Sequence, residues 1–214
     1  MAIKAVLIDF DGTLANTNKI VLQSFQHTYR TFQGREEDPA VIYHTFGEPL
    51  RTTLDRVFGK EYEEEAVTVY RAFQMERFED LIEPFPGMDR LVHQLKEKGY
   101  QTAIVTSRVQ ESALKGIRKF GLEGAIDVIT SVDELDKHKP DPECIFRTLE
   151  KLGRTPEEVV MLGDTRFDIL CAHNAGCPSI LVDWAVMPEE ERQQLDPDLL
   201  AKTPDEILEW IISR

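Results

Sequence analysis

Two aspartates, Asp9 and Asp11, stand two positions apart directly after a short apolar run in the 214-residue chain. Aspartate disfavours strands, and an uncompensated buried charge is costly, so this spacing predicts a cation close to the pair. Gly12 permits a tight turn and Thr13 supplies a hydrogen-bond donor or a helix cap. A solvated loop or a helix N-cap would explain an isolated pair of this kind equally well. The rest of the chain must therefore decide between these interpretations.

Short apolar runs recur along the chain and are separated by amphipathic segments of helix length. Strands that alternate with helices predict a parallel sheet covered on both faces, that is, a doubly wound α/β core. Crossovers in such a sheet are right-handed. The expected strands are residues 3–8, 102–105, 125–129, 159–162 and 179–182.

The helices of this core have clear faces and ends. Met88, Leu91 and Leu95 share one face before Gly99, and Pro142 and Gly153 bound a second helix. The binding crevice of an open parallel sheet lies beyond the carboxyl ends of its strands. We therefore expect the loops that carry Asp9, Thr106 and Asp164 to meet there.

A helical insertion interrupts the core. Most of residues 16–83 show apolar spacings of three and four, as in the series Leu22, Phe25, Tyr29 and Phe32. The segment 83–87, with two prolines and a glycine, ends the insertion and could serve as a hinge. The expected domains are a core of residues 1–15 plus 84–214 and a helical cap of residues 16–83.

Composition excludes several function classes. The chain has 39 acidic and 25 basic residues and a formal charge of −14, so its field repels nucleic acid and acidic membranes. Three cysteines without C-x-x-C spacing fit a reducing compartment and are interpreted as packing residues. No apolar run of about 18 residues is present. We expect a cytoplasmic monomer or homodimer whose partner is a small molecule.

Four motifs in order carry a family resemblance. Residues 9–14, Asp-Phe-Asp-Gly-Thr-Leu, resemble motif one of the haloacid dehalogenase superfamily. Thr106, at the end of an expected strand, resembles motif two, and residues 139–143, Lys-Pro-Asp-Pro-Glu, resemble motif three. Residues 163–168, Gly-Asp-Thr-Arg-Phe-Asp, resemble motif four. The resemblance spans nearly the whole chain and implies a Rossmann-like core with an inserted cap.

The resemblance implies a phosphoryl-transfer site. Asp9 would attack phosphorus and form an aspartyl-phosphate, and Asp11 would act as general acid and then as general base. Mg²⁺ would be held by the side chain of Asp9, the backbone carbonyl of Asp11 and the carboxylate of Asp164. Asp168 would be either a further ligand or a residue that supports the ligands.

The same resemblance assigns the phosphate contacts. Thr106 would donate its hydroxyl to a phosphoryl oxygen, assisted by the N–H groups of Ser107 and Gly12, and Lys139 would neutralise phosphate and nucleophile. None of the five histidines has metal-ligand spacing with a second histidine or cysteine, which disfavours zinc or iron.

The choice among relatives rests on two positions. The superfamily's dehalogenases and phosphonatases lack a carboxylate at the place of Asp11, and beta-phosphoglucomutases carry a histidine where this chain has Val21. The chain looks most like the phosphoglycolate phosphatase and bacterial pyrophosphatase group. We predict a Mg²⁺-dependent phosphatase for a small, phosphoglycolate-like metabolite. The alternatives are an inorganic pyrophosphatase, a beta-phosphoglucomutase-like phosphotransferase and a non-catalytic binding protein.

Three arginines are candidate substrate contacts. Arg51 lies in a segment that resembles a substrate-facing turn and could hold a second anionic group. Arg108 follows Thr106 by two positions, and Arg166 lies inside motif four. Each could equally be a surface arginine that faces water.

Overall fold

The computed structural model describes residues 2–214, and the chain divides into two compact units. The first unit combines the N-terminal segment up to Asn16 with Glu83–Arg214. The second unit is Thr17–Ile82.

A six-stranded parallel sheet, in the order β5-β4-β1-β6-β7-β8, forms the centre of the first unit. Its strands are β1 Ala5–Ile8, β4 Gln101–Val105, β5 Val128–Thr130, β6 Val159–Gly163, β7 Ser179–Val182 and β8 Leu199–Ala201. The central strand β1 is apolar and buried along its whole length, as expected for a strand covered on both faces. The predicted doubly wound α/β core is confirmed.

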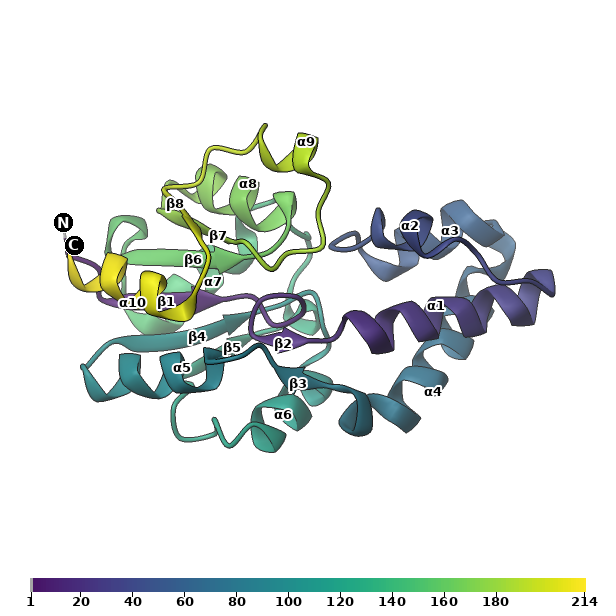
Figure 1. Ribbon diagram of the computed structural model, residues 1–214, viewed down its shortest axis with the longest axis horizontal. Helices are drawn as coiled ribbons and strands as arrows, with labels where there is room; N and C mark the ends of the chain where they lie inside the picture. Colours follow the sequence, from purple (N-terminus) through teal and green to yellow (C-terminus); the bar gives the residue numbers. More distant parts are fainter. Residues whose placement is uncertain (1) are drawn as a thin grey trace. The chain divides into compact units, whose positions relative to one another are not determined.

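Helices cover both sides of this sheet. Figure 1 shows α5 and α6 along one side and α8 on the other. The helices are α5 Met88–Glu97, α6 Gln110–Lys119, α7 Glu143–Leu152, α8 Arg166–Ala175, the short α9 Glu189–Arg192 and α10 Pro204–Ile212, with 3-10 turns at Val132–Glu134 and Pro156–Glu158. Leu7 and Met161 pack with Ile145 of α7 and Ala172 of α8 in one buried cluster. This packing fixes where α7 and α8 begin relative to the strand ends.

Three sheet details differ from the sequence prediction. The strand expected at 125–129 begins only at Val128, because Ala125 is in a turn and donates its N–H to the Leu122 carbonyl. The strand β8 was not predicted. A two-stranded antiparallel ribbon, β2 Ala15–Asn16 with β3 Glu83–Pro84, was also not predicted, since Asn and Pro disfavour strands.

The second unit is helical, in agreement with the periodicity of its sequence. It consists of α1 Asn18–Gln33, α2 Pro39–Tyr43, α3 Leu50–Phe58, a 3-10 turn Lys60–Tyr62 and α4 Glu63–Leu81. Phe25, Tyr29, Leu54 and Tyr70 belong to its own buried core, and the rings of Phe25 and Tyr70 meet edge to face. No helix within residues 2–214 is long and apolar enough to cross a membrane.

Candidate active site

The carboxyl ends of the central strands bring the predicted motifs together. Asp9 follows β1, Thr106 follows β4 and Asp164 follows β6, and β1 pairs directly with both neighbours. The backbone N–H of Asp9 also donates to the Leu162 carbonyl of β6 over 2.9 Å. All three side chains are buried. The site is therefore positioned by the sheet itself rather than by long loops.

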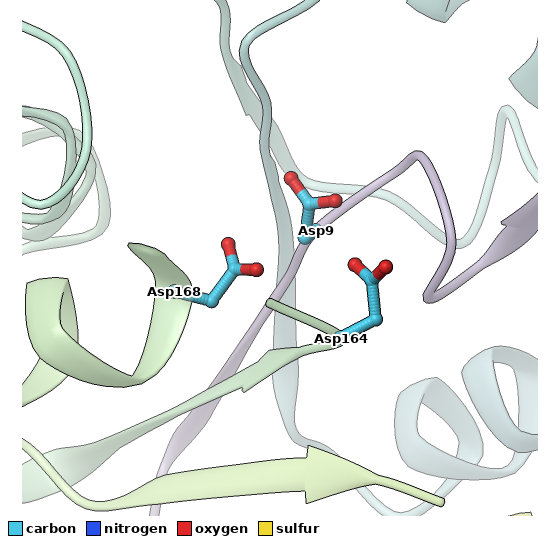
Figure 2. Close-up of side chains that lie close together, drawn as sticks. All are labelled: Asp9, Asp164 and Asp168. Atoms are coloured by element: carbon cyan, nitrogen blue, oxygen red, sulfur yellow. The ribbon is translucent and has the colours of Figure 1, made fainter. Parts of the chain in front are cut away.

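Three carboxylates converge at this edge. Asp9, Asp164 and Asp168 each offer an oxygen atom, and these oxygens lie within 4.8 Å of one another (Figure 2). Asp168 comes from the first turn of α8, and the other two come from the strand ends. Buried groups of like charge repel strongly, so this arrangement requires a cation.

Lys139 supplies one positive charge to the cluster. Its Nζ atom donates to Oδ1 of Asp9 and to Oδ1 of Asp168, each over 2.7 Å, and to the Val105 carbonyl over 2.8 Å. The lysine side chain is only 6% exposed. Each of its three N–H groups thus has a partner, which fixes the ammonium between β4, β1 and α8.

The cluster still has more negative than positive charge. Burial raises the pKa of Asp9 to about 8, while Lys139 opposes the rise and Asp168 and Asp11 add to it. Burial, together with Asp168 and Asp9, raises the pKa of Asp164 well above its ordinary value. Burial alone would lower the pKa of Lys139, but the carboxylates of Asp168 and Asp9 outweigh it and hold that pKa well above its usual range.

The donor set fits a divalent cation. When all three carboxylates are ionised, one ammonium leaves two negative charges uncompensated, and a single divalent ion that displaces the protons of Asp9 and Asp164 would balance them. All the converging donors are carboxylate oxygens, which suit hard cations such as Mg²⁺. The residues present therefore fit a hard divalent cation, and its identity as Mg²⁺ stays a prediction.

The carboxylates do not have equal freedom to bind a metal. Oδ1 of Asp168 accepts from Lys139, while its Oδ2 accepts from the Thr165 hydroxyl at 2.7 Å and the Thr165 N–H at 3.1 Å. Asp168 thereby caps its own helix. These donors fix the Asp168 carboxylate so that it orients Lys139. Direct metal binding by Asp168 stays a prediction.

Asp164 is held differently. Its Oδ1 accepts from the Thr13 hydroxyl over 3.1 Å, and its Oδ2 faces the backbone of Gly12. A Cβ on Gly12 would lie 2.0 Å from that Oδ2 atom, and Gly12 has a φ of +80°. Only glycine satisfies both the turn and the close approach. The loop of motif one is thus folded directly against Asp164.

The predicted phosphate contacts have different outcomes. Thr106 is buried at the end of β4, and its oxygen accepts from the Arg108 N–H over 3.1 Å, so its own O–H can serve another acceptor. Ser107 is exposed at the same edge. The Gly12 N–H donates to the Ala15 carbonyl 2.9 Å away, and its expected contact with phosphate stays a prediction.

Asp11 lies outside the three-carboxylate cluster. Its side chain instead pairs with Arg108, whose Nε and Nη2 atoms donate to the two carboxylate oxygens over 2.9 and 2.5 Å. A role of Asp11 in metal binding through its backbone carbonyl stays a prediction. This pairing was not predicted, because 97 positions separate the two residues and neither forms a local pattern with the other.

The other two arginines have acidic partners. Arg166 donates to Glu191 over 2.7 Å, and its guanidinium lies over the Phe167 ring. Arg51 belongs to α3 of the second unit, where it donates to Glu63 over 2.8 Å and to Glu64 over 2.6 Å. Substrate contact by either residue stays a prediction. The three cysteines are buried and free, as their interpretation as packing residues requires.

Comparison with known proteins gives one family. The profile of the haloacid dehalogenase-like hydrolases matches residues 6–182, which include every motif discussed above. Pyrophosphatase PpaX of Halalkalibacterium halodurans is 36% identical over 211 residues, covering 99% of this chain and 98% of that protein. Pyrophosphatase PpaX of Bacillus cereus is 31% identical over 208 residues, covering 97% and 96% of the two chains.

Solved structures show the same fold. A protein of Lactobacillus plantarum, provisionally named a phosphoglycolate phosphatase, superposes with a TM-score of 0.87 at 26% identity and covers 98% of this chain and 99% of its own. A haloacid dehalogenase-like hydrolase of Bacteroides fragilis superposes with a TM-score of 0.90 at 22% identity, covering 96% and 99%. The second likeness concerns the fold alone.

Proposed function

The chain belongs to the haloacid dehalogenase-like hydrolase family and is a phosphatase of that family, and we propose that it hydrolyses a small phosphorylated compound with Mg²⁺ through Asp9. The observation that carries this proposal is the contact of Lys139 with Asp9 inside a buried cluster of carboxylates. A carboxylate held this way is oriented for attack, and the same cluster can hold a divalent cation.

The proposed reaction has two displacements. An oxygen of Asp9 attacks phosphorus while the bond from phosphorus to the leaving oxygen breaks, and the electron pair departs with the leaving group. Asp11 protonates a leaving oxygen that needs a proton. Water then attacks the phosphoaspartate, its proton passes to Asp11, and the bond between phosphorus and Asp9 breaks to release orthophosphate.

The remaining residues stabilise charge during both steps. Thr106 donates its free O–H to a phosphoryl oxygen, and Lys139 keeps Asp9 oriented and balances charge on the transferred group. Bound Mg²⁺ would neutralise the phosphoryl oxygens and bring them next to the nucleophile. Asp9, Asp164 and the backbone carbonyl of Asp11 are the proposed ligands.

Pyrophosphate is our first candidate substrate. Relatives with 36% and 31% identity over almost the whole chain are named pyrophosphatases. A phosphoglycolate-like substrate is the second candidate, supported by the 26% identical Lactobacillus plantarum structure. Both compounds carry a second anionic group close to the phosphorus that is attacked.

The test is metal-dependent release of orthophosphate by the purified protein. The panel contains pyrophosphate, phosphoglycolate, sugar phosphates, nucleotides and p-nitrophenyl phosphate, each assayed with Mg²⁺ and with excess chelator. We expect Mg²⁺-dependent release, greatest for pyrophosphate by kcat/KM. Release that persists in chelator would remove the metal from the proposal. Interconversion of sugar phosphates without release would instead support a phosphotransferase, and no reaction at all would support a binding protein.

A further inference from the structure

We propose that Arg108 selects substrates whose leaving group is itself an anion, by exchanging its contact with Asp11 for a contact with that leaving group. This inference rests on the proposed function and concerns the same site. It assigns a chemical role to a pairing that neither the motifs nor the relatives' names describe. The shared chemistry of the substrates is a phosphate or carboxylate group beside the leaving oxygen.

Arg108 and Asp11 form a two-pronged ion pair in this structure. Nε donates to Oδ2 over 2.9 Å and Nη2 donates to Oδ1 over 2.5 Å. The side chain of Arg108 is 7% exposed, and the side chain of Asp11 is 33% exposed. A paired guanidinium in this geometry presents the same fork that recognises phosphate or carboxylate oxygens.

The guanidinium is held in place by more than Asp11. Its Nη1 atom donates to the Ser112 hydroxyl on α6 over 2.9 Å, and the guanidinium carbon lies 5.9 Å from the centre of the Phe10 ring. Its backbone N–H donates to Thr106. Arg108 is thus anchored to α6 and to two motif residues, so it can lose the contact with Asp11 without losing its position.

Distance places the leaving group within reach of Arg108. A proton donor must lie about 2.6–3.2 Å from the leaving oxygen that it serves. Since Arg108 lies within hydrogen-bond distance of both Asp11 oxygens, that leaving oxygen falls within about 6 Å of the guanidinium. An anionic group on or next to the leaving oxygen is then within reach of the arginine fork.

The exchange also changes what Asp11 can do. While both of its oxygens accept from Arg108, the ion pair holds the carboxylate of Asp11 against the guanidinium, so Asp11 must turn away from Arg108 to serve a leaving group or a water molecule. An anionic leaving group that takes over Arg108 frees Asp11 for proton transfer. A neutral leaving group offers Arg108 no competing anion, so the pair persists and activity is lower.

The hydrolysis of pyrophosphate shows where bonds, charge and protons go in this reaction. Asp9 forms a bond to one phosphorus, the bridging P–O bond breaks, and its electron pair leaves on orthophosphate, whose charge Arg108 compensates. Water then cleaves the phosphoaspartate and gives its proton to Asp11, which later returns it to solvent. One pyrophosphate and one water become two orthophosphates, and the enzyme returns to its starting state.

The experiment compares Arg108→Gln with the wild-type protein on three substrates in saturating Mg²⁺. Pyrophosphate and phosphoglycolate have anionic leaving groups, whereas 2-hydroxyethyl phosphate has the skeleton of phosphoglycolate with a neutral leaving group. We expect kcat/KM to fall at least about tenfold for an anionic-leaving substrate and to stay within about twofold, or rise, for 2-hydroxyethyl phosphate. If Arg108 had a merely structural role, kcat/KM would fall by the same factor for all three substrates.

Matched variants keep the test decisive. Arg118→Gln makes the same change at the other end of α6, where the exposed guanidinium pairs with Glu123, and should leave all three activities unchanged. Arg108→Lys keeps the charge but lacks the planar fork, and it provides a second variant in case Arg108→Gln does not fold. It should show the same selectivity among substrates with a smaller loss of kcat/KM. Thermal unfolding of each variant verifies that it is folded.

The outcomes distinguish a leaving phosphate from a carboxylate as the partner of Arg108. They also distinguish a failure of this inference from a failure of the proposed function. If kcat/KM falls with pyrophosphate alone, Arg108 recognises a leaving phosphate. If it falls with phosphoglycolate alone, Arg108 recognises a carboxylate. An equal loss on all three substrates in both Arg108 variants, or no loss on any, overturns the inference. Absence of Mg²⁺-dependent turnover in the wild-type protein would instead count against the proposed function.

Discussion

Lys139 lies 2.7 Å from Asp9, Nζ to Oδ1, although 130 positions separate the two residues. The same ammonium bonds Asp168 and the Val105 carbonyl, so one side chain connects the ends of β1 and β4 to the start of α8. This contact orients the carboxylate of Asp9 and leaves the cluster short of positive charge.

The first prediction concerns Asp9 as nucleophile. Asp9→Asn keeps the size of the side chain and an oxygen that can accept from Lys139, but an amide oxygen is a far weaker nucleophile than a carboxylate. We expect kcat for phosphate release to fall about 1,000-fold or more. Steady-state release of orthophosphate from the best substrate, in Mg²⁺, measures this.

A matched substitution controls for loss of charge. Asp136→Asn makes the same change on an exposed residue of the same unit and should leave kcat unchanged. If Asp9→Asn kept more than about a tenth of wild-type turnover, the covalent role of Asp9 would be excluded.

The second prediction concerns stability of the metal-free protein against pH. The pKa of Asp9 is raised from its ordinary value of 3.8 to about 8, so the folded protein retains a proton that the unfolded chain has lost between those values. The free energy of unfolding therefore decreases as pH rises through this window, by at most about 1.4 kcal/mol per pH unit for this group. Asp9→Asn should reduce the slope. Urea unfolding in chelator at pH 5 and pH 8 measures it.

Mg²⁺ should reverse this loss of stability. The cation must displace protons from Asp9 and Asp164, so its affinity should increase from pH 5 to pH 8. At a free concentration about 100 times Kd, the ion would add about 2.7 kcal/mol to the free energy of unfolding. The control is Asp136→Asn, which should respond like wild type. An equal Mg²⁺ response in Asp164→Asn would argue against the proposed site.

The fold was largely predictable because the periodicity of buried strands and helices is local. The run that ends at Asp9, the helix face of Met88 and the cap at Gly153 each carry their own signal, and all three elements are present. The ribbon β2–β3 and the strand β8 were missed, since two or three residues cannot show a period. Pairing with a neighbour, rather than propensity, makes them strands.

The site was predictable only as far as its motifs are local. Asp9, Thr106 and Asp164 could be placed at strand ends, and the sheet brings those ends together. Lys139 was a candidate only through its motif, because it lies in the loop before α7. The pairing of Asp11 with Arg108 joins the loops that follow the neighbouring strands β1 and β4, and no spacing in the sequence shows which side chains of those loops meet. The internal use of the Gly12 N–H by the tight turn, where it donates to Ala15, was likewise not predicted from the sequence.

The third prediction concerns Gly12, where a close approach to Asp164 and a positive φ each favour glycine. A Cβ there would meet Asp164 Oδ2 at 2.0 Å, and its φ of +80° is itself strained for other residues. Gly12→Ala should lower the free energy of unfolding by about 2 kcal/mol or more and weaken Mg²⁺ binding, because Asp164 must move. Urea unfolding and Mg²⁺-dependent shifts in Tm measure the two effects.

Gly121→Ala is the matched control, since Gly121 has a φ of +70° and a Cβ added there would meet no atom within 4 Å. It should cost about 1 kcal/mol through backbone strain alone. Mg²⁺ binding should be unaffected there. Equal losses of Mg²⁺ affinity in the two variants would show that the close approach of Gly12 to Asp164 does not shape the metal site.

The last prediction concerns the hydroxyl of Thr106. Its oxygen accepts from the Arg108 N–H, which leaves the O–H hydrogen to donate to a phosphoryl oxygen in the transition state. Thr106→Val keeps the shape of the side chain and removes this donor, so kcat should fall about 100-fold, as for the loss of one oxyanion donor. Thr106→Ser keeps the hydroxyl and should stay within about tenfold of wild type. Because both variants alter the same buried side chain, Tm reports any packing loss separately from kcat. Two variants with equal kcat would mean that the hydroxyl only holds the Arg108 backbone.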